Sequence, residues 1–129
     1  MDAQLLENVE LQFGVTLPSV YRKLLLNFPI ELAPNEKRRF FKNVGEYELF
    51  SNAALIVEFN ECVRECSSWG DEGPWPTYLF VIGHDGCGGY YTIDHTLECA
   101  PVFFWNHGTA AFESAYNSID EFVQMLSAD

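Results

Sequence analysis

The sequence predicts one α+β domain over residues 1 to 129, with a mostly antiparallel β-sheet packed with N-terminal, middle and C-terminal helices. Three observations indicate this class. Apolar residues recur at helical spacing over residues 3 to 28, and β-branched and aromatic runs fill residues 77 to 107. A helix-initiating pattern then follows at Ser118. A chain of 129 residues is long enough to bury a core of its own.

The first half begins with two expected helices. The stretch AQLLENVELQF (residues 3 to 13) carries its apolar side chains on one stripe, and Gly14 ends it. A second helix is expected from Leu17-Pro18, with Pro18 at the first helical position, where the missing N–H costs nothing. Pro29 marks the end of this second helix.

A short strand and a third helix follow. Residues 46 to 50, EYELF, alternate polar and apolar side chains and are typical of a strand. Ser51 or Asn52 then caps a helix over residues 52 to 67. We expect its buried face to comprise Leu55, Phe59, Cys62 and Cys66.

Three strands are expected in the second half, over residues 77 to 83, 89 to 94 and 101 to 107. Residues 109 to 117 are ambiguous and predict an extended or irregular segment. Ser118 with Glu121 three residues later then forms a capping box that opens the last helix. Its inward side chains are Ile119, Phe122, Val123 and Leu126.

The charge distribution restricts the class of partner. The formal net charge is −12, and residues 65 to 129 carry ten acidic side chains and no Lys or Arg. Nucleic acid and anionic membranes are therefore disfavoured, because both are bound through Lys and Arg. A basic protein surface fits such a chain, and the alternative is that the acidity serves solubility.

The N-terminus lacks the basic start and apolar run of a secretory signal, and no apolar run approaches a membrane span. We therefore expect a cytoplasmic protein with reduced cysteines. It is expected to be a monomer or a weak homodimer, since an aromatic strand at a sheet edge favours self-association.

The stretch VIGHDGCGGYYTID, residues 81 to 94, has four glycines within seven positions. A dinucleotide-binding loop needs a helix after its glycines, but here a strand-forming run follows and no Lys-Ser or Lys-Thr pair is present. The glycines are better suited to the positive φ angles of a hairpin turn.

Two chemical alternatives involve the cysteines. A thiol site could draw on His84, Asp85, Cys87, Asp94 and His95. A reactive thiol usually needs an electropositive setting, which this half of the chain lacks. Zinc could be held by Cys62 and Cys66, four apart on a helix, together with Cys87, Cys99 and the histidines. The scattered spacing favours no metal and no cofactor.

The tryptophans are candidate interface residues. Trp69 and Trp75 flank the acidic pair Asp71-Glu72 in a loop rich in Pro and Gly. Exposed aromatic side chains beside charge are typical anchors of protein interfaces. The alternative is that each tryptophan fills the edge of the core.

Four motifs in order resemble the SUKH superfamily, which includes yeast cell-wall-assembly regulators and bacterial immunity proteins. They are Leu17-Pro18-x-x-Tyr21-x-x-Leu24-Leu25, the hairpin Phe80-Val81-Ile82-Gly83…Gly86-x-Gly88…Ile93-Asp94, Pro101-Val102-Phe103-Phe104-Trp105-x-His107, and Ser118-Ile119-x-Glu121-Phe122-x-x-x-Leu126.

The resemblance implies a SUKH-like fold without enzyme activity, and a bacterial immunity protein that occludes a cognate toxin, often a nuclease. A nuclease domain is basic because it holds phosphate, so an acidic surface suits it. A regulatory interaction module without a toxin is the alternative. The expected interface residues are Trp69, Asp71, Glu72, Trp75, Asp85, Glu98 and Glu113.

Overall fold

The computed structural model describes residues 1–29, 32, 40–41, 45–46, 48–65, 73–86 and 88–127. Its elements in chain order are α1 (Ala3–Phe13), α2 (Ser19–Leu26), β1 (Phe40–Phe41), β2 (Gly45–Glu46), β3 (Glu48–Leu49), α3 (Ala53–Glu65), β4 (Leu79–His84), β5 (Tyr90–Asp94), β6 (Val102–Asn106), β7 (Ala111–Tyr116) and α4 (Ile119–Ser127). This composition confirms the α+β class.

The main sheet has the strand order β3-β4-β5-β6-β7, and every neighbouring pair is antiparallel. Successive strands are therefore neighbours in space, which short turns allow. The small pair β1-β2 forms a separate antiparallel sheet. The strand expected over residues 46 to 50 is divided between β2 and β3, and Tyr47 lies outside the described residues.

The first two helices agree with the sequence apart from one end. The Asp2 carboxylate accepts a hydrogen bond from the Leu5 N–H at 2.8 Å, and Gly14 ends α1 with φ of 65°. Pro18 is the N-cap of α2 and not its first helical residue. The helix ends at Leu26, before Pro29, because the residues preceding a proline avoid helical geometry.

The buried face of α3 differs from the expected one. Ile56, Asn60 and Val63 are fully buried, whereas Cys62 is exposed and Cys66 lies outside the described residues. The expectation placed Cys62 in the core, and it was wrong. Asn60 can be buried because the Val81 backbone of β4 and the Ile56 carbonyl of α3 supply hydrogen-bond partners for its side-chain amide.

The second half confirms the expected strands and adds one. The ambiguous segment over residues 109 to 117 contains β7, an edge strand of the main sheet. In the turn between β4 and β5, Gly86 and Gly88 have φ of 80° and 93°, as expected for a hairpin connection.

The capping box of α4 also forms. The Ser118 hydroxyl accepts from the Glu121 N–H at 3.1 Å, and the Glu121 carboxylate accepts from the Asn117 N–H at 3.3 Å. Ile119, Phe122 and Leu126 are buried as expected.

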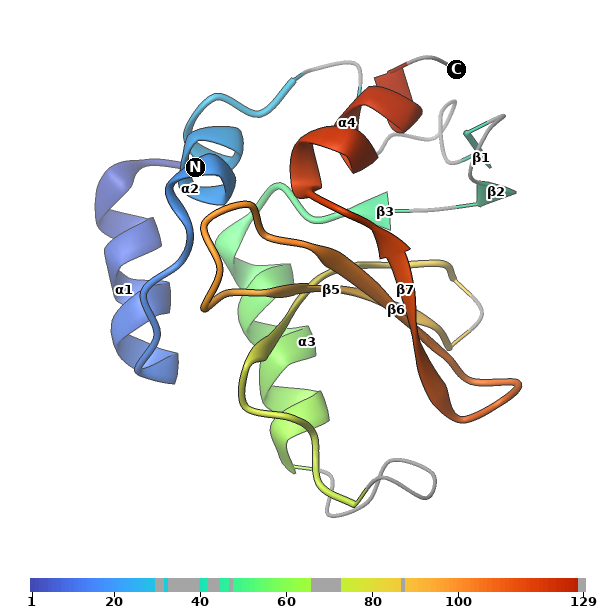
Figure 1. Ribbon diagram of the computed structural model, residues 1–129. Coiled ribbons are helices and arrows are strands. Elements are labelled where there is room, and N and C mark those ends of the chain that lie inside the picture. Colours follow the sequence, from blue (N-terminus) through green and yellow to red (C-terminus); the bar gives the residue numbers. More distant parts are fainter. Residues whose placement is uncertain are drawn as a thin grey trace.

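Helices cover both faces of the sheet (Figure 1). The neighbouring residues Tyr90 and Tyr91 point to opposite faces of β5. Tyr90 contacts Phe59 of α3 with ring centroids 6.0 Å apart, and Tyr91 contacts Phe122 of α4 at 4.9 Å. The helices α3 and α4 therefore pack on opposite faces, with α1 and α2 at one end. Within the described residues, no helix has the length and apolar character to cross a membrane.

Candidate functional site

The described structure places four of the seven predicted interface residues. Trp69, Asp71 and Glu72 lie outside the described residues, so their role stays a prediction. The remaining four are Trp75, Asp85, Glu98 and Glu113.

Trp75 is buried and is not an exposed anchor. Its side chain is 5% exposed, and its indole N–H donates to the Leu79 carbonyl at 2.9 Å. Its ring packs edge-on against Tyr90 at 6.2 Å and Phe112 at 5.1 Å. The expectation of an exposed Trp75 was therefore wrong, and the alternative that it fills the edge of the core holds. Two neighbouring aromatic rings and an internal carbonyl make burial favourable for a tryptophan.

Asp85 closes the turn between β4 and β5. Its carboxylate accepts from the Gly89 N–H at 2.9 Å, and its own N–H donates to the Gly89 carbonyl at 3.2 Å. A Cβ atom at Gly89 would lie 2.7 Å from the other Asp85 oxygen and would overlap the Phe104 ring. Phe104 therefore covers the Gly89 backbone and brings β6 against the carboxylate of Asp85.

Glu113 lies beside Phe104 on the neighbouring strand. The two residues are paired in the register of β6 and β7, and Phe104 is also paired with Tyr91 on β5. The Glu113 carboxylate is exposed and accepts a hydrogen bond from the Asn106 amide at 3.2 Å. Phe104 is therefore a neighbour of both Asp85 and Glu113.

Two more tyrosines extend this cluster toward α4. The Tyr91 and Phe104 rings lie 4.8 Å apart, and Tyr116 stacks on Phe122 at 4.7 Å. Burial, the nearby Tyr116 hydroxyl and the Asp85 carboxylate together raise the pKa of Tyr91 to about 12. Burial and the Glu121 carboxylate raise the pKa of Tyr116.

We call this cluster the acidic-aromatic face. It comprises Asp85, Tyr91, Phe104, Glu113, Tyr116 and Glu121. A hollow of about 220 Å³ lies within it, lined by Tyr91, Phe104, Glu113 and Tyr116 among others. Half-buried rings surrounded by carboxylates can pack against the aliphatic stems of Lys and Arg while the carboxylates pair with their charged ends.

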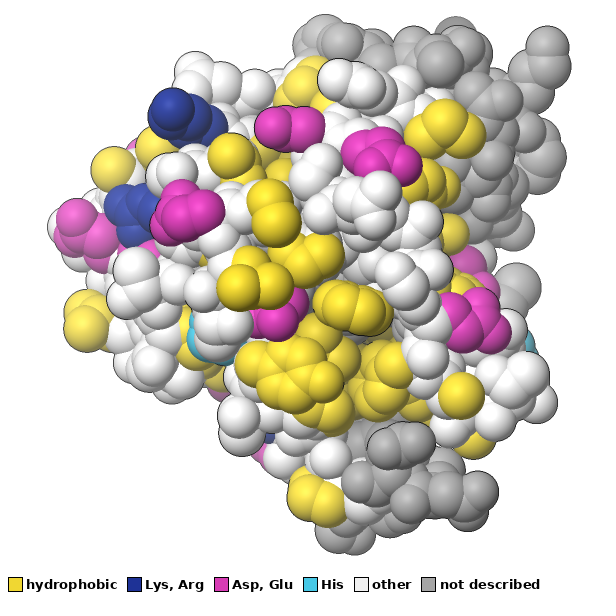
Figure 2. Space-filling view, viewed as in Figure 1, with side chains coloured by type: hydrophobic (Ala, Val, Ile, Leu, Met, Phe, Trp, Pro, Cys, Tyr) yellow, Lys and Arg dark blue, Asp and Glu magenta, His cyan; other side chains and the backbone are white. Residues whose placement is uncertain are grey.

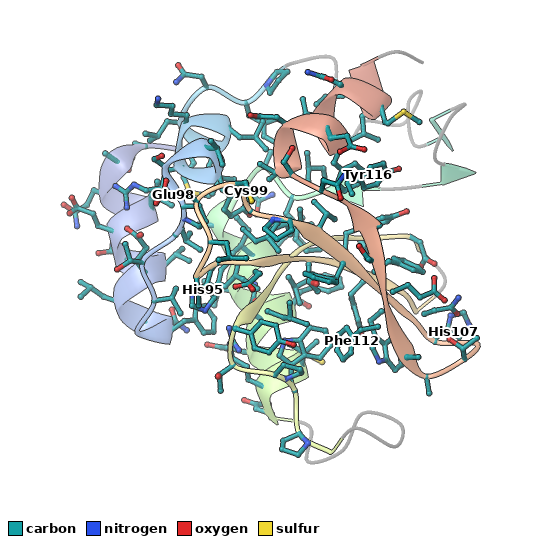
Figure 3. The ribbon with its side chains drawn as sticks, viewed as in Figure 1. His95, Glu98, Cys99, His107, Phe112 and Tyr116 are labelled. Atoms are coloured by element: carbon teal, nitrogen blue, oxygen red, sulfur yellow. The ribbon has the colours of Figure 1, made fainter. Side chains whose placement is uncertain are left out.

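Glu98 does not belong to the acidic-aromatic face. It lies in the turn between β5 and β6, where its carboxylate accepts from the Ser19 hydroxyl at 3.0 Å. Figure 3 shows Glu98 at the left, beside α1 and α2, and His107 at the right, at the other end of the sheet. The side chain of His107 lies against the turn that holds Asp85, because a Cβ atom at Gly88 would lie 3.4 Å from its ring. Glu98 and Asp85, two of the predicted interface residues, therefore lie at opposite ends of the sheet.

Among the described residues, Figure 2 shows Lys and Arg side chains at the upper left, over α1 and α2, and hydrophobic side chains gathered near the centre of the view. Arg22 of α2 forms an ion pair with Glu10 of α1. The charge of Arg22 is therefore paired within the helices.

The residues of the possible thiol site are separated. His84 and Asp85 lie at the end of β4, whereas Asp94 and His95 lie at the far end of β5. The His84 ring stacks on Phe50 at 5.6 Å, and Cys87 lies outside the described residues. Among the described residues, no three His, Cys, Asp or Glu side chains are grouped to hold a metal ion.

The sequence did not single out Tyr91, Phe104, Tyr116 or Glu121 as site residues. Residues 91 and 93 alternate with 90 and 92 along β5, so the face of Tyr91 was readable once the strand was placed. The position of Tyr116 was not readable, because β7 was ambiguous in the sequence.

A family model described as SMI1 / KNR4 family (SUKH-1) matches residues 1–125. Searches of curated proteins and of solved structures found no match. The family match covers nearly the whole chain. The chain therefore belongs to the SMI1 / KNR4 family (SUKH-1).

Proposed function

We propose that this protein is an immunity protein, which binds a cognate toxin domain with a basic surface and neutralises it by occlusion. Family membership supports an immunity or regulatory role in general. The observation that carries the finer proposal is the acidic-aromatic face, where three carboxylates surround three half-buried aromatic rings.

The charge of this face fits a basic partner. Asp85, Glu113 and Glu121 belong to a stretch of the chain with no Lys or Arg after Arg64. Complementary charge speeds the encounter of two proteins and disfavours wrong partners. A domain that acts on nucleic acid presents Lys and Arg to phosphate, so it carries the surface that this face would attract.

Occlusion requires no catalytic group. The aromatic rings supply apolar area at the centre and the carboxylates supply charge around it, which is the usual anatomy of a specific interface. Such a complex neutralises a toxin by covering its substrate site. Trp69, Asp71 and Glu72, which lie outside the described residues, remain proposed contributors.

Affinity capture tests the proposal. The purified protein is immobilised and exposed to lysate of its source organism, and bound proteins are identified by mass spectrometry as the salt concentration is raised. We expect a basic toxin domain that is released at high salt, and whose activity is lost when the purified protein is added at equal amount. Recovery of endogenous regulators without any toxin domain would support a regulatory module and overturn the immunity proposal.

A further inference from the structure

A second hollow lies on the α3 side of the sheet, whereas the acidic-aromatic face lies on the side of α4. It has a volume of about 580 Å³ and is formed where the ends of α1 and α3 approach the segments before β4 and after β5. Its lining includes the apolar side chains of Phe13, Val15 and Trp75 and the polar side chains of Arg64 and His95. This volume is in the range of pockets that hold small organic molecules.

Arg64 is the unusual member of this lining. Its guanidinium lies over the Phe13 ring, 5.5 Å from the centroid. The Nε and one Nη atom are shielded from solvent and have no hydrogen-bond partner within the described part of the chain. Burial lowers the pKa of Arg64, yet an arginine side chain stays protonated. A shielded cation without an acceptor costs free energy unless an anion completes it.

His95 and the backbone around it fix the opposite wall. The His95 Nε2 atom lies 3.1 Å from the Thr77 carbonyl oxygen, and because a carbonyl only accepts, Nε2 carries the proton. The His95 N–H donates to the Tyr78 carbonyl at 3.1 Å. Figure 3 labels His95 at the left of the sheet. Trp75, which also lines this pocket, packs against Tyr90 on the α3 side, whereas Tyr91 of the acidic-aromatic face points to the α4 side.

We propose that this pocket binds a small organic carboxylate whose carboxylate pairs with Arg64 and whose apolar body packs among Phe13, Val15 and Trp75. The planar guanidinium has paired N–H donors that match the two oxygens of a carboxylate. Because its Nε and one Nη atom are shielded from solvent, the guanidinium must turn toward the pocket to offer them to the ligand. The apolar walls require a hydrocarbon or aromatic body beside that charge. A monoanion suits this chain better than a phosphate dianion, because the net charge of −12 repels the second charge more strongly.

This inference stands apart from the proposed function, since the ligand would bind on the α3 side of the sheet and the toxin on the α4 side. A pocket variant that loses carboxylate binding but still binds the toxin would show that the ligand site is independent of the toxin interface. A variant of the acidic-aromatic face, such as Glu113→Lys, is expected to give the reverse result: it weakens toxin binding and keeps carboxylate binding.

The test is a ligand titration followed by nuclear magnetic resonance. Acetate, phenylacetate, indole-3-acetate, the neutral phenylacetamide and inorganic phosphate are titrated into the ¹⁵N-labelled protein. The signals observed are the Arg64 Nε–H and the Trp75 indole N–H. We expect phenylacetate or indole-3-acetate to shift both signals saturably, with affinity about tenfold above that of acetate and phenylacetamide.

Matched variants assign the effect to Arg64. Arg64→Gln is expected to abolish binding, and Arg64→Lys to weaken it, because lysine keeps the charge without the planar fork. Lys23→Gln removes the same charge from an exposed position outside the pocket and is expected to bind as the unmodified chain does. Equal binding of phenylacetamide, tighter binding of phosphate, unchanged binding in Arg64→Gln, or no saturable shift with any carboxylate would each overturn the proposal.

A stability measurement provides a second readout that needs no ligand. Arg64→Met keeps an unbranched stem but removes the unpaired charge. If Arg64 serves a ligand, the melting temperature of Arg64→Met without ligand is expected to equal or exceed that of the unmodified chain. A clear decrease would mean that the guanidinium is a structural element, and it would contradict the ligand role.

Discussion

The side chain of Asn60 pairs with both backbone polar groups of Val81. Its amide oxygen accepts from the Val81 N–H at 2.8 Å, and its amide nitrogen donates to the Val81 carbonyl at 3.0 Å. The same nitrogen donates to the Ile56 carbonyl at 2.9 Å. The edge strand β3 lies beside β4 and ends at Leu49. Among the described residues, the last backbone hydrogen bond on this side of β4 runs from the Phe50 N–H to the Ile82 carbonyl. Asn60 therefore takes the place of a strand neighbour for Val81 and joins α3 to the sheet.

Asn60→Leu should destabilise the fold by about 3 kcal/mol, because it leaves the buried N–H and carbonyl of Val81 without partners. Chemical denaturation measures this loss. Asn8→Leu, an identical substitution at an exposed helical position, should change the unfolding free energy by less than about 0.5 kcal/mol. A loss below about 1 kcal/mol in Asn60→Leu would show that water replaces the amide.

Tyr21→Phe should leave the unfolding free energy unchanged or raise it by about 1 kcal/mol. The Tyr21 side chain is fully buried, and its hydroxyl has no hydrogen-bond partner in the described part of the chain. Tyr78→Phe, at a side chain that is 47% exposed, serves as the control. A loss of more than about 1 kcal/mol in Tyr21→Phe would reveal a partner for the hydroxyl.

Alkaline unfolding should depend on the buried tyrosines. Burial raises the pKa of Tyr21 above its usual value and raises that of Tyr91 to about 12. The folded state therefore holds both rings neutral, whereas the unfolded chain ionises them near the usual value of 10.0. Their contribution to stability is complete below that value and is lost as the pH rises through the folded pKa.

Tyr21→Phe and Tyr91→Phe should each move the midpoint of alkaline unfolding to higher pH, because one tyrosine fewer pulls the equilibrium toward the unfolded state. Circular dichroism across the pH range from neutral to strongly alkaline measures the midpoint. Tyr78→Phe should leave it in place. A midpoint that moves equally in all three variants would point to a general effect of losing a hydroxyl.

Glu113→Lys should slow association with the basic partner about tenfold at low salt, since it reverses an exposed charge of the acidic-aromatic face. The rate is measured by stopped flow or surface plasmon resonance over a series of salt concentrations. The difference from the unmodified chain should shrink as salt screens the charges.

Glu98→Lys is the matched control, with the same change of charge at the opposite end of the sheet. It should associate at close to the unmodified rate. If Glu98→Lys slowed association and Glu113→Lys did not, the interface would lie on the turn between β5 and β6.

Gly89→Ala should weaken partner binding while costing only about 1 kcal/mol of stability. The new methyl group would displace the end of the Phe104 ring and the Asp85 carboxylate, both of which can move. Gly14→Ala should cost a similar amount through its φ of 65° but leave binding intact, because it lies in open space at the end of α1. Equal binding of both variants would remove Phe104 from the interface.

The fold could be read from the sequence wherever pattern and local chemistry agree. Gly14 ends α1, Ser118 caps α4, and the glycines at 86 and 88 turn the hairpin, because each of these requirements is local. Asn60 and β7 show the limit. A polar residue is read as exposed unless its partner is known, and the partner of Asn60 is the backbone of a strand that lies 21 residues further along the chain.

The candidate site was readable only in part for the same reason. Acidity after Arg64 indicates a charged surface, but the pairing of strands decides which carboxylates meet. Phe104 joins Asp85 to Glu113, whereas Glu98 is carried to the far end by one reversal of the chain. The loop around Trp75 is rich in Pro, Gly and acidic residues, which is typical of an exposed anchor. Trp75 is nevertheless buried, because it packs against the rings of Tyr90 and Phe112.

The exposed middle of β7 has an evolutionary consequence. Glu113 and Ser114 are consecutive exposed residues on an edge strand, and neither belongs to the buried core. Substitutions at these two positions therefore leave the packing of the domain intact. Under the proposed function, single mutations at this strand would change which toxin is recognised as the toxin sequence diverges, without a new fold.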